Sequence, residues 1–378
     1  MSLQFSLYLD IVRFLAAISV LLSHADVRDI IATDIFPVSF GHNAVIVFFM
    51  LSGYVIAYVA DTRERTPRAF WVSRFARIYS VALPVMLLTP VLDLVGGGID
   101  LEKYKIASTH DYWWIRMGAS LVFMNELWFV SIMPFSNSPY WSLCYEMCYY
   151  VLFSVYCFER GRRRAILLTI LCLIIGPKIL VLMPIWALGV FIYQYKPLRE
   201  ISERTGWLLL LLSMLGVYAH HYFDIYTVLS NVFAGLVGEH LYELFHFSKH
   251  FLSDYVLALA IAANFVGVRV IAHRIMPLFN SVASVVKNLS VYTFALYLFH
   301  LPLLLFVSVV IRSDTKGIDH YLFLVGLVFA ACVLIGVLTE VFKNRLKVWL
   351  SLNLPQSLEW SAVLSSYRRL RNIRVVNR

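Results

Sequence analysis

Long apolar stretches recur along the whole of this 378-residue chain. A stretch of about 18 or more mostly apolar residues is what an α-helix needs to cross a bilayer. Hydrophobic residues make up 60% of the chain and charged residues only 15%, against about 45–50% and about 25% in soluble domains. The sequence therefore predicts an all-α, polytopic membrane helix bundle rather than a soluble domain.

Two arginine-rich stretches between the apolar segments predict the topology. The stretches "RERTPRAFWVSRFAR" (residues 63–77) and "ERGRRRA" (residues 159–165) should both be cytoplasmic, because Lys and Arg concentrate in cytoplasmic loops. An even number of crossings must separate them, yet three apolar segments lie between. We expect the weakest segment, 118–133, not to cross, because Asn125 and Glu126 interrupt it. It is predicted to be re-entrant or packed in an outer region of about 94–139.

This reasoning predicts about ten transmembrane helices with both termini in the cytoplasm. The expected spans are 7–25, 43–61, 77–95, 140–158, 165–181, 183–195, 207–223, 252–271, 289–311 and 321–342. Residues 1–345 are expected to form one membrane domain. Residues 346–378 are expected to form a basic cytoplasmic tail, which could lie on the anionic inner leaflet.

The formal net charge of +9 does not indicate nucleic-acid binding, because the basic residues lie in short loops between apolar segments. The five cysteines all fall in apolar segments without a metal-type spacing, so we expect buried thiols rather than disulfides or a zinc site. They are Cys144, Cys148, Cys157, Cys172 and Cys332.

Ionisable residues inside the first span, "DIVRFLAAISVLLSH", are costly in lipid and mark a candidate site. Arg13 and His24 are eleven residues apart, close to three helical turns, so they share one face at a separation of about 16 Å. Asp10 precedes Arg13 by three residues and can pair with it. The alternative is a structural ion pair with a histidine at the membrane interface.

The second and third spans carry further candidates. Ser52, followed by Gly53, interrupts "FFMLSGYVIAY", and the alternative reading is close helix packing by small residues. In "RFARIYS", Arg74 and Arg77 are three residues apart at the entry of the third span. Paired guanidinium groups suit phosphate recognition, although orientation of the span would also explain them.

Two later spans add polar groups at helical spacing. In "YWSLCYEMCYY", Ser142 and Glu146 lie four residues apart, beside Trp141. In "SVYTFALYLFH", Tyr297 and His300 lie three residues apart. A structural hydrogen-bond hub and a core histidine are the alternatives. Together with the earlier groups, these residues predict a buried reaction chamber between the helices.

These motifs, in this order, resemble those of acyltransferase family 3, integral membrane O-acyltransferases that modify bacterial surface glycans, peptidoglycan, antibiotics and lipid-linked sugars. The resemblance covers about residues 5–342. The matching elements are Arg13 to His24, Phe48 to Gly53, Arg74 to Tyr79, Trp141 to Glu146, and Ser290 to His300. The family often has Pro after the third element, where this chain has Ser80.

The resemblance implies an enzyme of the bacterial inner membrane that uses acetyl-CoA as co-substrate and no metal. The acceptor would be a hydroxyl of a cell-surface or lipid-linked glycan. Membrane lipids surround the protein, and no nucleic-acid partner is implied. The acceptor sugar, acetyl against longer acyl groups, and the oligomeric state are left open.

The motifs also suggest roles. His24 would be the general base, while Arg13 would stabilise negative charge or anchor the donor and Asp10 would orient Arg13. The remaining residues fall into three groups by expected role. Arg74, Arg77 and Tyr79 would bind coenzyme A. Glu146 and Ser142 would belong to the catalytic group and shape its acceptor end, while Trp141, Tyr297, His300 and Ser52 would line the substrate chamber.

Two alternatives remain at this point. A covalent acyl intermediate on His24 or Ser142 is an alternative to direct transfer. A transporter or flippase of a polar or lipid-linked substrate would also use interior charges. The sequence contains no recognisable inverted repeat and no matched pair of Gly/Pro-broken helices, which favours the enzyme.

Overall fold

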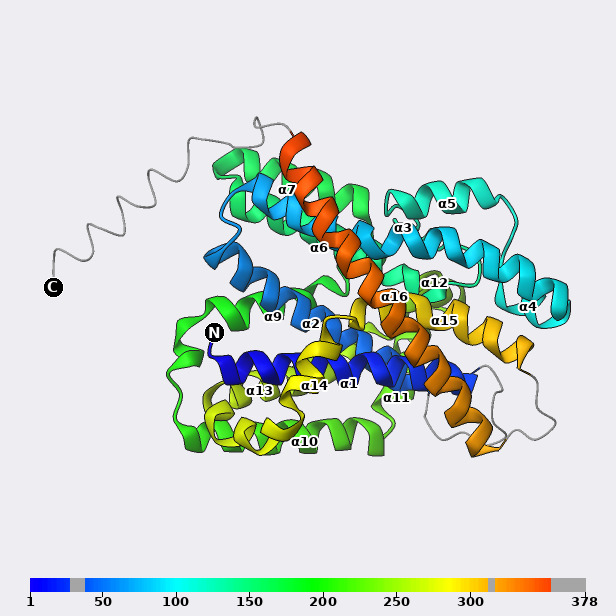
Figure 1. Ribbon diagram of the computed structural model, residues 1–378. Helices are drawn as coiled ribbons and strands as arrows, with labels where there is room; N and C mark the ends of the chain where they lie inside the picture. Colours follow the sequence, from blue (N-terminus) through cyan, green and yellow to red (C-terminus); the bar gives the residue numbers. More distant parts are fainter. Residues whose placement is uncertain (28–37, 312–316, 355–378) are drawn as a thin grey trace, which may run out of the picture.

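The computed structural model describes residues 1–27, 38–311 and 317–354, and within these ranges it contains only helices and loops (Figure 1). The first half comprises α1 (Leu3–Val27), α2 (Val38–Thr62), α3 (Pro67–Ile99), α4 (Leu101–Ala107), α5 (Trp113–Leu121), η1 (Ser138–Tyr140), α6 (Trp141–Phe158), α7 (Gly161–Ile175), α8 (Pro177–Leu180), α9 (Met183–Gln194) and η2 (Lys196–Arg199). The second half comprises α10 (Glu203–Tyr222), α11 (Ile225–Val237), α12 (Glu239–Leu244), η3 (His246–Ser248), α13 (Phe251–Ile275), η4 (Met276–Phe279), α14 (Asn280–Ser290), α15 (Thr293–Val310) and α16 (Ile318–Asn353). The prediction of an all-helical chain is confirmed for the described residues.

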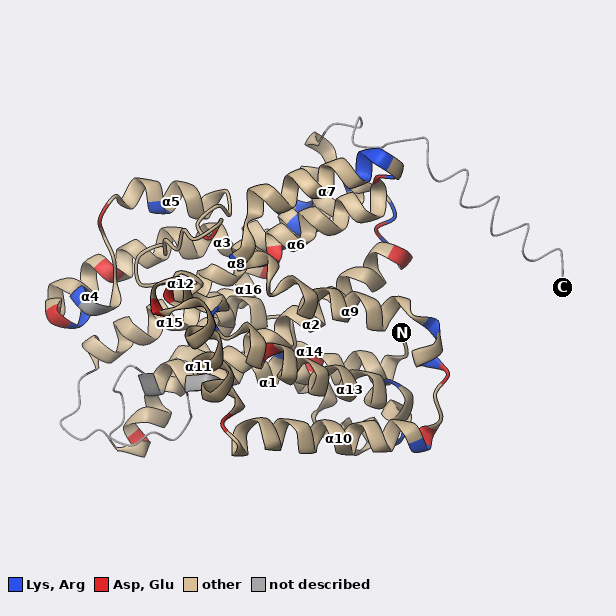
Figure 2. Cartoon of the chain, turned by 180° about the vertical axis from the view of Figure 1, so that it is seen from behind, with Lys and Arg blue, Asp and Glu red and all other residues tan. Residues whose placement is uncertain are grey.

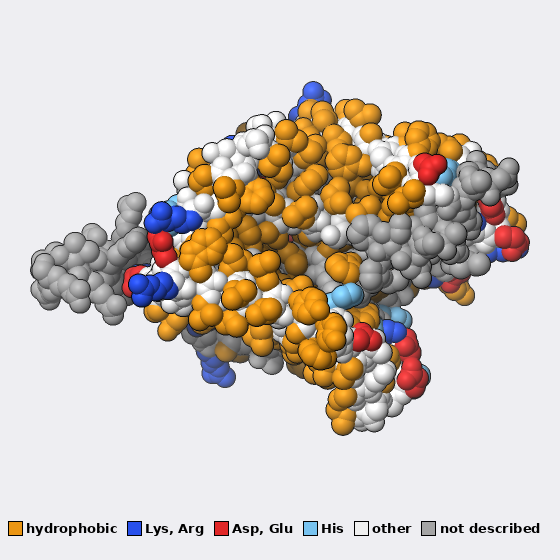
Figure 3. Space-filling view, turned by 90° about the horizontal axis from the view of Figure 1, so that it is seen from below, with side chains coloured by type: hydrophobic (Ala, Val, Ile, Leu, Met, Phe, Trp, Pro, Cys, Tyr) orange, Lys and Arg blue, Asp and Glu red, His pale blue; other side chains and the backbone are white. Residues whose placement is uncertain are grey.

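The long helices lie side by side, and α16 runs obliquely across them (Figure 1). Helix pairs α10 with α13, α2 with α9, and α1 with α2 pack most extensively. Charged residues lie mainly near the helix ends (Figure 2), and the face seen from below is largely apolar (Figure 3). This distribution is expected of a bundle surrounded by lipid, because charge is costly at membrane depth.

Seven helical segments of the described chain are long and apolar enough to cross a membrane. They are Leu3–Ala25, Phe40–Thr62, Pro67–Ile99, Pro177–Gln194, Phe251–Ser290, Thr293–Val310 and Ile318–Asn353. An eighth candidate is the pair α10 and α11, which is bent by 62°. The predicted spans 140–158 and 165–181 are helical but are not among these candidates. Helix α7 has only 15 residues, and α6 carries Glu146 and several tyrosines.

Two helix ends differ from the ends of the predicted spans. Gly176 has a φ of 85°, and it separates α7 from α8, so residues 177–181 continue into the following span rather than closing the previous one. The last helix does not end near 342, because α16 runs to Asn353. The expected division at 345/346 therefore lies inside a helix, and residues 355–378 of the predicted tail lie outside the described residues.

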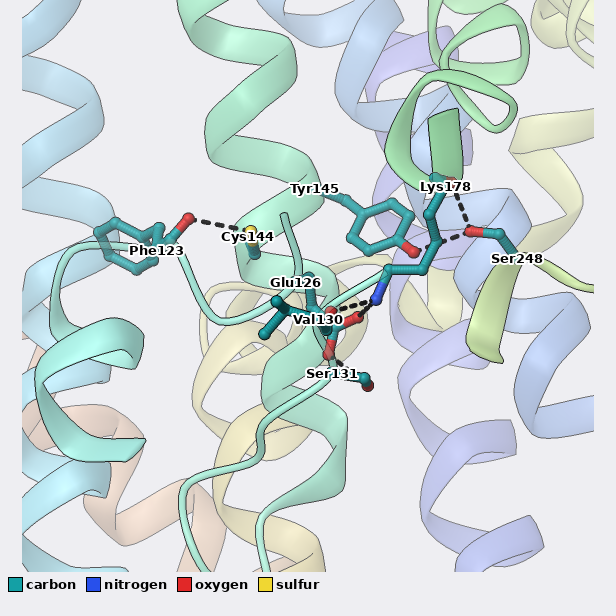
Figure 4. Close-up of polar contacts among 8 residues, drawn as sticks. All are labelled: Phe123, Glu126, Val130, Ser131, Cys144, Tyr145, Lys178 and Ser248. Carbon is teal, nitrogen blue, oxygen red and sulfur yellow. Dashed lines mark hydrogen bonds and ion pairs between the residues drawn. The ribbon is translucent and has the colours of Figure 1, made fainter. Parts of the chain in front are cut away.

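The segment 118–133 forms the end of α5 followed by irregular chain, and it is not a membrane-spanning helix, as predicted. A buried ion pair holds this loop to α8 (Figure 4): the Lys178 ammonium donates to the Glu126 carboxylate and to the Val130 carbonyl, and both charged side chains are fully buried. Ser131 Oγ donates to Glu126 at 2.8 Å. Burial raises the pKa of Glu126 to about 7, although Lys178 opposes that shift.

The backbone of Lys178 also contacts η3, so Lys178 connects the loop to that element. Ser248 Oγ donates to the Lys178 carbonyl at 2.7 Å, and the Tyr145 hydroxyl lies 2.8 Å from Ser248 Oγ. Figure 4 shows Tyr145, Ser248 and Lys178 converging from three different elements. The loop, α6, α8 and η3 are therefore fixed relative to one another, and η3 forms part of a wall described below.

Glycines set the closest helix contacts. A Cβ at Gly53 would overlap the Trp186 carbonyl, and one at Gly189 would overlap the Met50 carbonyl, so α2 and α9 pack backbone against backbone. This agrees with the packing interpretation of Gly53. Where α1 meets α2, a Cβ on Gly41 would stand 3.0 Å from that of Ser23.

Candidate active site

One cavity lies between α1, α2, α3, α6 and α15, and encloses about 670 Å³. We call it the arginine cavity, because Arg13 and Arg77 both line it. Six of the residues predicted from the sequence lie on its wall: Arg13, Ser52, Arg77, Ser142, Glu146 and Tyr297. They come from five helices, so the convergence arises only in the folded bundle.

Glu146 anchors the polar side of the arginine cavity. Ser52 Oγ donates to Glu146 Oε1 at 2.9 Å, and the Tyr150 hydroxyl donates to the same oxygen. The Trp186 indole in turn donates to Ser52 Oγ at 3.3 Å. Ser52 therefore faces the cavity, while its neighbour Gly53 packs against α9.

The two arginines of α3 have different surroundings. Arg74 is 4% exposed, forms an ion pair with Glu64, and lies over the Phe70 and Tyr150 rings. Arg77 lines the cavity and lies over the Phe294 ring, with no ion pair among the described residues. Only Arg77 thus presents its charge to the cavity, and the structure separates two residues that the sequence grouped together.

The first helix presents its charges along the bundle interior. Arg13 Nη1 lies 3.1 Å from Asp10 Oδ1, so the predicted pair forms, and Arg13 reaches the arginine cavity while Asp10 does not line it. Tyr79, expected at a coenzyme A site, instead donates from its hydroxyl to the Leu121 carbonyl at 3.0 Å. Tyr79 therefore packs against the end of α5 and lines neither cavity.

A second cavity, of about 1030 Å³, lies nearer the opposite end of α1. We call it the histidine cavity, because its wall includes His24, His42, His246 and His250. Trp141 also lines it, stacked on Phe247 with ring centroids 4.6 Å apart. Its other walls come from the start of α2, η1, α11, α12, η3 and the turn into α13.

The hydrogen bonds of His24 and His300 define their tautomers. His300 is 1% exposed, and its Nδ1 lies 2.8 Å from the Tyr297 carbonyl, so Nδ1 carries a proton. In the neutral ring, His300 Nε2 is then an acceptor, and it lies 3.2 Å from His24 Nδ1. His24 Nδ1 also lies 2.9 Å from the Val20 carbonyl. The proton of His24 therefore belongs on Nδ1, and Nε2 is the basic nitrogen.

The two cavities meet at Val45 and Tyr297, which line both. The Tyr297 hydroxyl is held at the boundary, 2.8 Å from Ser142 Oγ and 3.2 Å from the Pro139 carbonyl. Arg13 lies on one side of this boundary and His24 on the other. The arginine cavity can therefore hold an anion, and the histidine cavity beside it presents a basic nitrogen.

The family-level comparison agrees with this architecture. A model of the acyltransferase domain of acyltransferase family 3 matches residues 6–337, nearly the whole chain. The chain belongs to acyltransferase family 3. With its apolar helices, this makes it a multi-pass membrane acyltransferase.

A curated protein is similar to part of the chain. Acyltransferase MdmB of Streptomyces mycarofaciens is 30% identical over 125 residues, which is 31% of this chain and 28% of that protein. The similarity thus spans less than a third of the relative's length. No solved structure matches the chain.

Several site residues of this acyltransferase family 3 member were not identified from sequence. Tyr150 completes the Glu146 cluster, and its signal was its position four residues after Glu146. His42 pairs with Asp254 at 2.9 Å. Both are ionisable residues in apolar segments, "FGHNAVIVFF" and "FLSDYV", so the cost of charge in a membrane was a signal for them too.

Proposed function

We propose that the protein is an O-acyltransferase that moves an acetyl group from cytoplasmic acetyl-CoA to a hydroxyl of a cell-surface or lipid-linked glycan. The observation that carries this proposal is the junction of the arginine and histidine cavities at Val45 and Tyr297. Donor and acceptor can enter from opposite ends of the bundle and meet inside it. The bacterial inner membrane is the location we propose.

The arginine cavity suits the donor. Coenzyme A carries phosphates at one end and its thioester at the other, and guanidinium groups bind phosphate well. Arg77 has no ion pair among the described residues, so it is the principal phosphate ligand in this proposal, with Arg13 deeper in the cavity. The pantetheine arm then extends toward Tyr297, which brings the thioester to the boundary with the histidine cavity.

The histidine cavity supplies the base. His24 Nε2 accepts the proton of the acceptor hydroxyl as the hydroxyl oxygen attacks the thioester carbonyl carbon. The carbon–sulfur bond breaks, and the coenzyme A thiolate takes the proton back from the imidazolium. His300 keeps the proton of neutral His24 on Nδ1, so Nε2 is unprotonated when the reaction starts.

Direct transfer is favoured over an acyl-serine intermediate. A serine nucleophile needs a neighbouring base, but Ser142 Oγ contacts only the Tyr297 hydroxyl and the Pro139 carbonyl among the described residues. Ser142 therefore positions Tyr297 at the boundary between the two cavities.

The test uses the purified full chain in liposomes with acetyl-labelled acetyl-CoA and an extract of bacterial envelope glycans. We expect label in the glycan fraction, loss of that transfer in His24→Ala, and unchanged acetyl-CoA binding by the same variant. Glycan movement across the membrane without label transfer would contradict the proposal and favour the transporter.

A further inference from the structure

A second histidine and a buried carboxylate stand in the histidine cavity without a role in the steps above. His42 Nε2 lies 2.9 Å from Asp254 Oδ1, and the Asp254 side chain is 1% exposed. The other oxygen, Asp254 Oδ2, is buried with no hydrogen-bond partner among the described residues. The carboxylate therefore acts mainly on His42, fixing its orientation and keeping a proton on Nε2.

This pair lies next to the general base because of how two helices meet. Gly41 lacks a side chain where Ser23 approaches it, and a Cβ there would be 3.0 Å from that of Ser23. His24 and His42 each follow one of these contact residues directly. Both line the same cavity, so a molecule bound to His42 stands beside His24.

A third histidine of this cavity, His250, has a protonation state and a tautomer that its surroundings define. Burial lowers the pKa of His250 to about 3, so this ring is neutral at physiological pH. Ser230 Oγ donates to the Tyr226 carbonyl at 2.6 Å, so it must accept from His250 Nδ1, also 2.6 Å away. The remaining nitrogen, His250 Nε2, is then a hydrogen-bond acceptor.

The wall thus offers ring nitrogens that accept hydrogen bonds. Neither His42 Nδ1 nor His250 Nε2 has a hydrogen-bond partner among the described residues, and both rings line the cavity. Acceptors of this kind suit hydroxyl groups, which donate, and do not suit phosphate or carboxylate. The one ammonium on this wall, Lys249, is already bound by both oxygens of Glu243, at 2.7 and 2.9 Å.

The rest of the cavity fits the same ligand. Trp141 stacks on Phe247 with an interplanar angle of 2°, and Tyr226 stacks on His250 with ring centroids 4.2 Å apart. The cavity wall therefore also carries flat aromatic rings near the acceptor nitrogens. A sugar ring presents C–H faces and hydroxyl edges, which match that combination. The described residues include no group of three His, Cys, Asp or Glu side chains placed to hold a metal ion.

We propose that the histidine cavity binds an uncharged saccharide ring, and that His42, held by Asp254, positions the ring by accepting a hydrogen bond from a hydroxyl next to the one that is acylated. This inference rests on the proposed acetyl transfer and names its acceptor class. His42 and Asp254 are positioning residues, and His24 remains the base.

The experiment measures acetyl transfer by the purified full chain in nanodiscs. The acceptors are methyl glycosides of glucose, galactose, mannose and rhamnose, with methyl glucuronide as the anionic arm. The variants are His42→Phe, which keeps a ring but removes both nitrogens, and Asp254→Asn. His221→Phe is the matched control, because His221 is exposed and lines neither cavity. The readouts are the KM for the glycoside, the KM for acetyl-CoA, and kcat.

We expect at least one uncharged glycoside to be acetylated. His42→Phe should raise the KM for that glycoside roughly three- to tenfold, the value of one hydrogen bond, with an unchanged KM for acetyl-CoA. Asp254 is buried and its variant could misfold, so His42→Phe carries the test if Asp254→Asn does not purify as a single species. His221→Phe should match the parent.

Three results would overturn this inference while leaving the acetyl transfer proposal intact: acetylation of the glucuronide alone, an unchanged glycoside KM in His42→Phe, or binding of acetyl-CoA without acetylation of any glycoside while envelope glycans still accept label. Failure to bind acetyl-CoA at all would instead overturn the proposed function, and the inference with it.

Discussion

At the scale of single residues, the structure assigns different environments to side chains that look equivalent in sequence. Arg74 and Arg77 share one helix and one motif, yet Arg74 is buried against Glu64 and Arg77 faces a cavity. His24 and His300 are both histidines in apolar helices, but of the two only His24 lines a cavity, with Nε2 as its basic nitrogen.

The arginine pair yields the first prediction. Arg77→Ala should weaken coenzyme A binding by about tenfold or more, because it removes a charged hydrogen-bonding group worth about 1.5–3 kcal/mol. Arg74→Ala should chiefly lower thermal stability, because it leaves Glu64 without its buried partner. Binding of labelled coenzyme A and thermal unfolding in detergent separate the two effects. Equal losses of affinity would contradict the assignment.

The histidine pair yields the second prediction. Replacing His300 by Ala removes the acceptor from His24 Nδ1 and should lower kcat on the order of tenfold, less than the 10²–10⁴ expected for loss of the base itself. The KM for acetyl-CoA should not change. His300→Gln, which keeps an acceptor oxygen in reach, should recover part of kcat, and a variant with no recovery would point to a packing role.

Sequence reasoning identified much of this residue set, for a physical reason. Charge inside a span is costly, so Arg13, His24 and Glu146 were conspicuous. Glu64, the partner of Arg74, was not conspicuous, because it lies in a short loop and a carboxylate is common in loops. Tyr79 was placed by motif alone, and only the fold shows that the outer loop holds its hydroxyl.

At the scale of helices and loops, each of the ten predicted spans falls largely on helix, but this does not give the number of helices that cross the membrane. Seven or eight segments meet the length and apolarity of a span, because α6 is polar on its buried face and α7 is short. The break at Gly176 depends on Trp128, whose backbone would meet a Cβ there. Because this contact joins residues almost fifty positions apart, the local sequence around Gly176 could not predict it.

The loop after α5 gives a prediction at this scale. Glu126→Gln should destabilise the protein by about 3–5 kcal/mol, because it leaves the Lys178 ammonium buried without a countercharge. The double variant Glu126→Gln with Lys178→Met should recover most of that loss, since it removes both charges. Thermal unfolding in detergent measures both. A double variant no more stable than the single one would show that the pair is not what fixes the loop.

At the scale of the whole molecule, the positions of the charges suggest which end of the bundle faces the cytoplasm. The N-terminus, residues 63–66, 159–160 and 195–202 gather at one end (Figure 1), and basic side chains are frequent there (Figure 2). The histidine cavity lies toward the opposite end of α1. Under the positive-inside rule, the arginine cavity then faces the donor made in the cytoplasm.

Cysteine labelling tests this orientation. Glu200 and Glu239 are both exposed glutamates, one between α9 and α10 and the other on α12. In a background with Cys157 and Cys172 replaced by Ser, an impermeant maleimide applied to intact spheroplasts should label Glu239→Cys at once. It should label Glu200→Cys only after permeabilisation. The remaining cysteines, Cys144, Cys148 and Cys332, are buried and should not react.

The reverse labelling would place the histidine cavity on the cytoplasmic side. Acetyl-CoA would then have to enter beside His42 and Lys249, and the acceptor beside Arg77. The uncharged acceptors of the histidine cavity are poorly suited to bind coenzyme A phosphates, whereas the Arg77 guanidinium is well suited to do so. A reversed orientation would therefore conflict with the chemistry of both cavities, and this single experiment tests the topology and the direction of acyl transfer together.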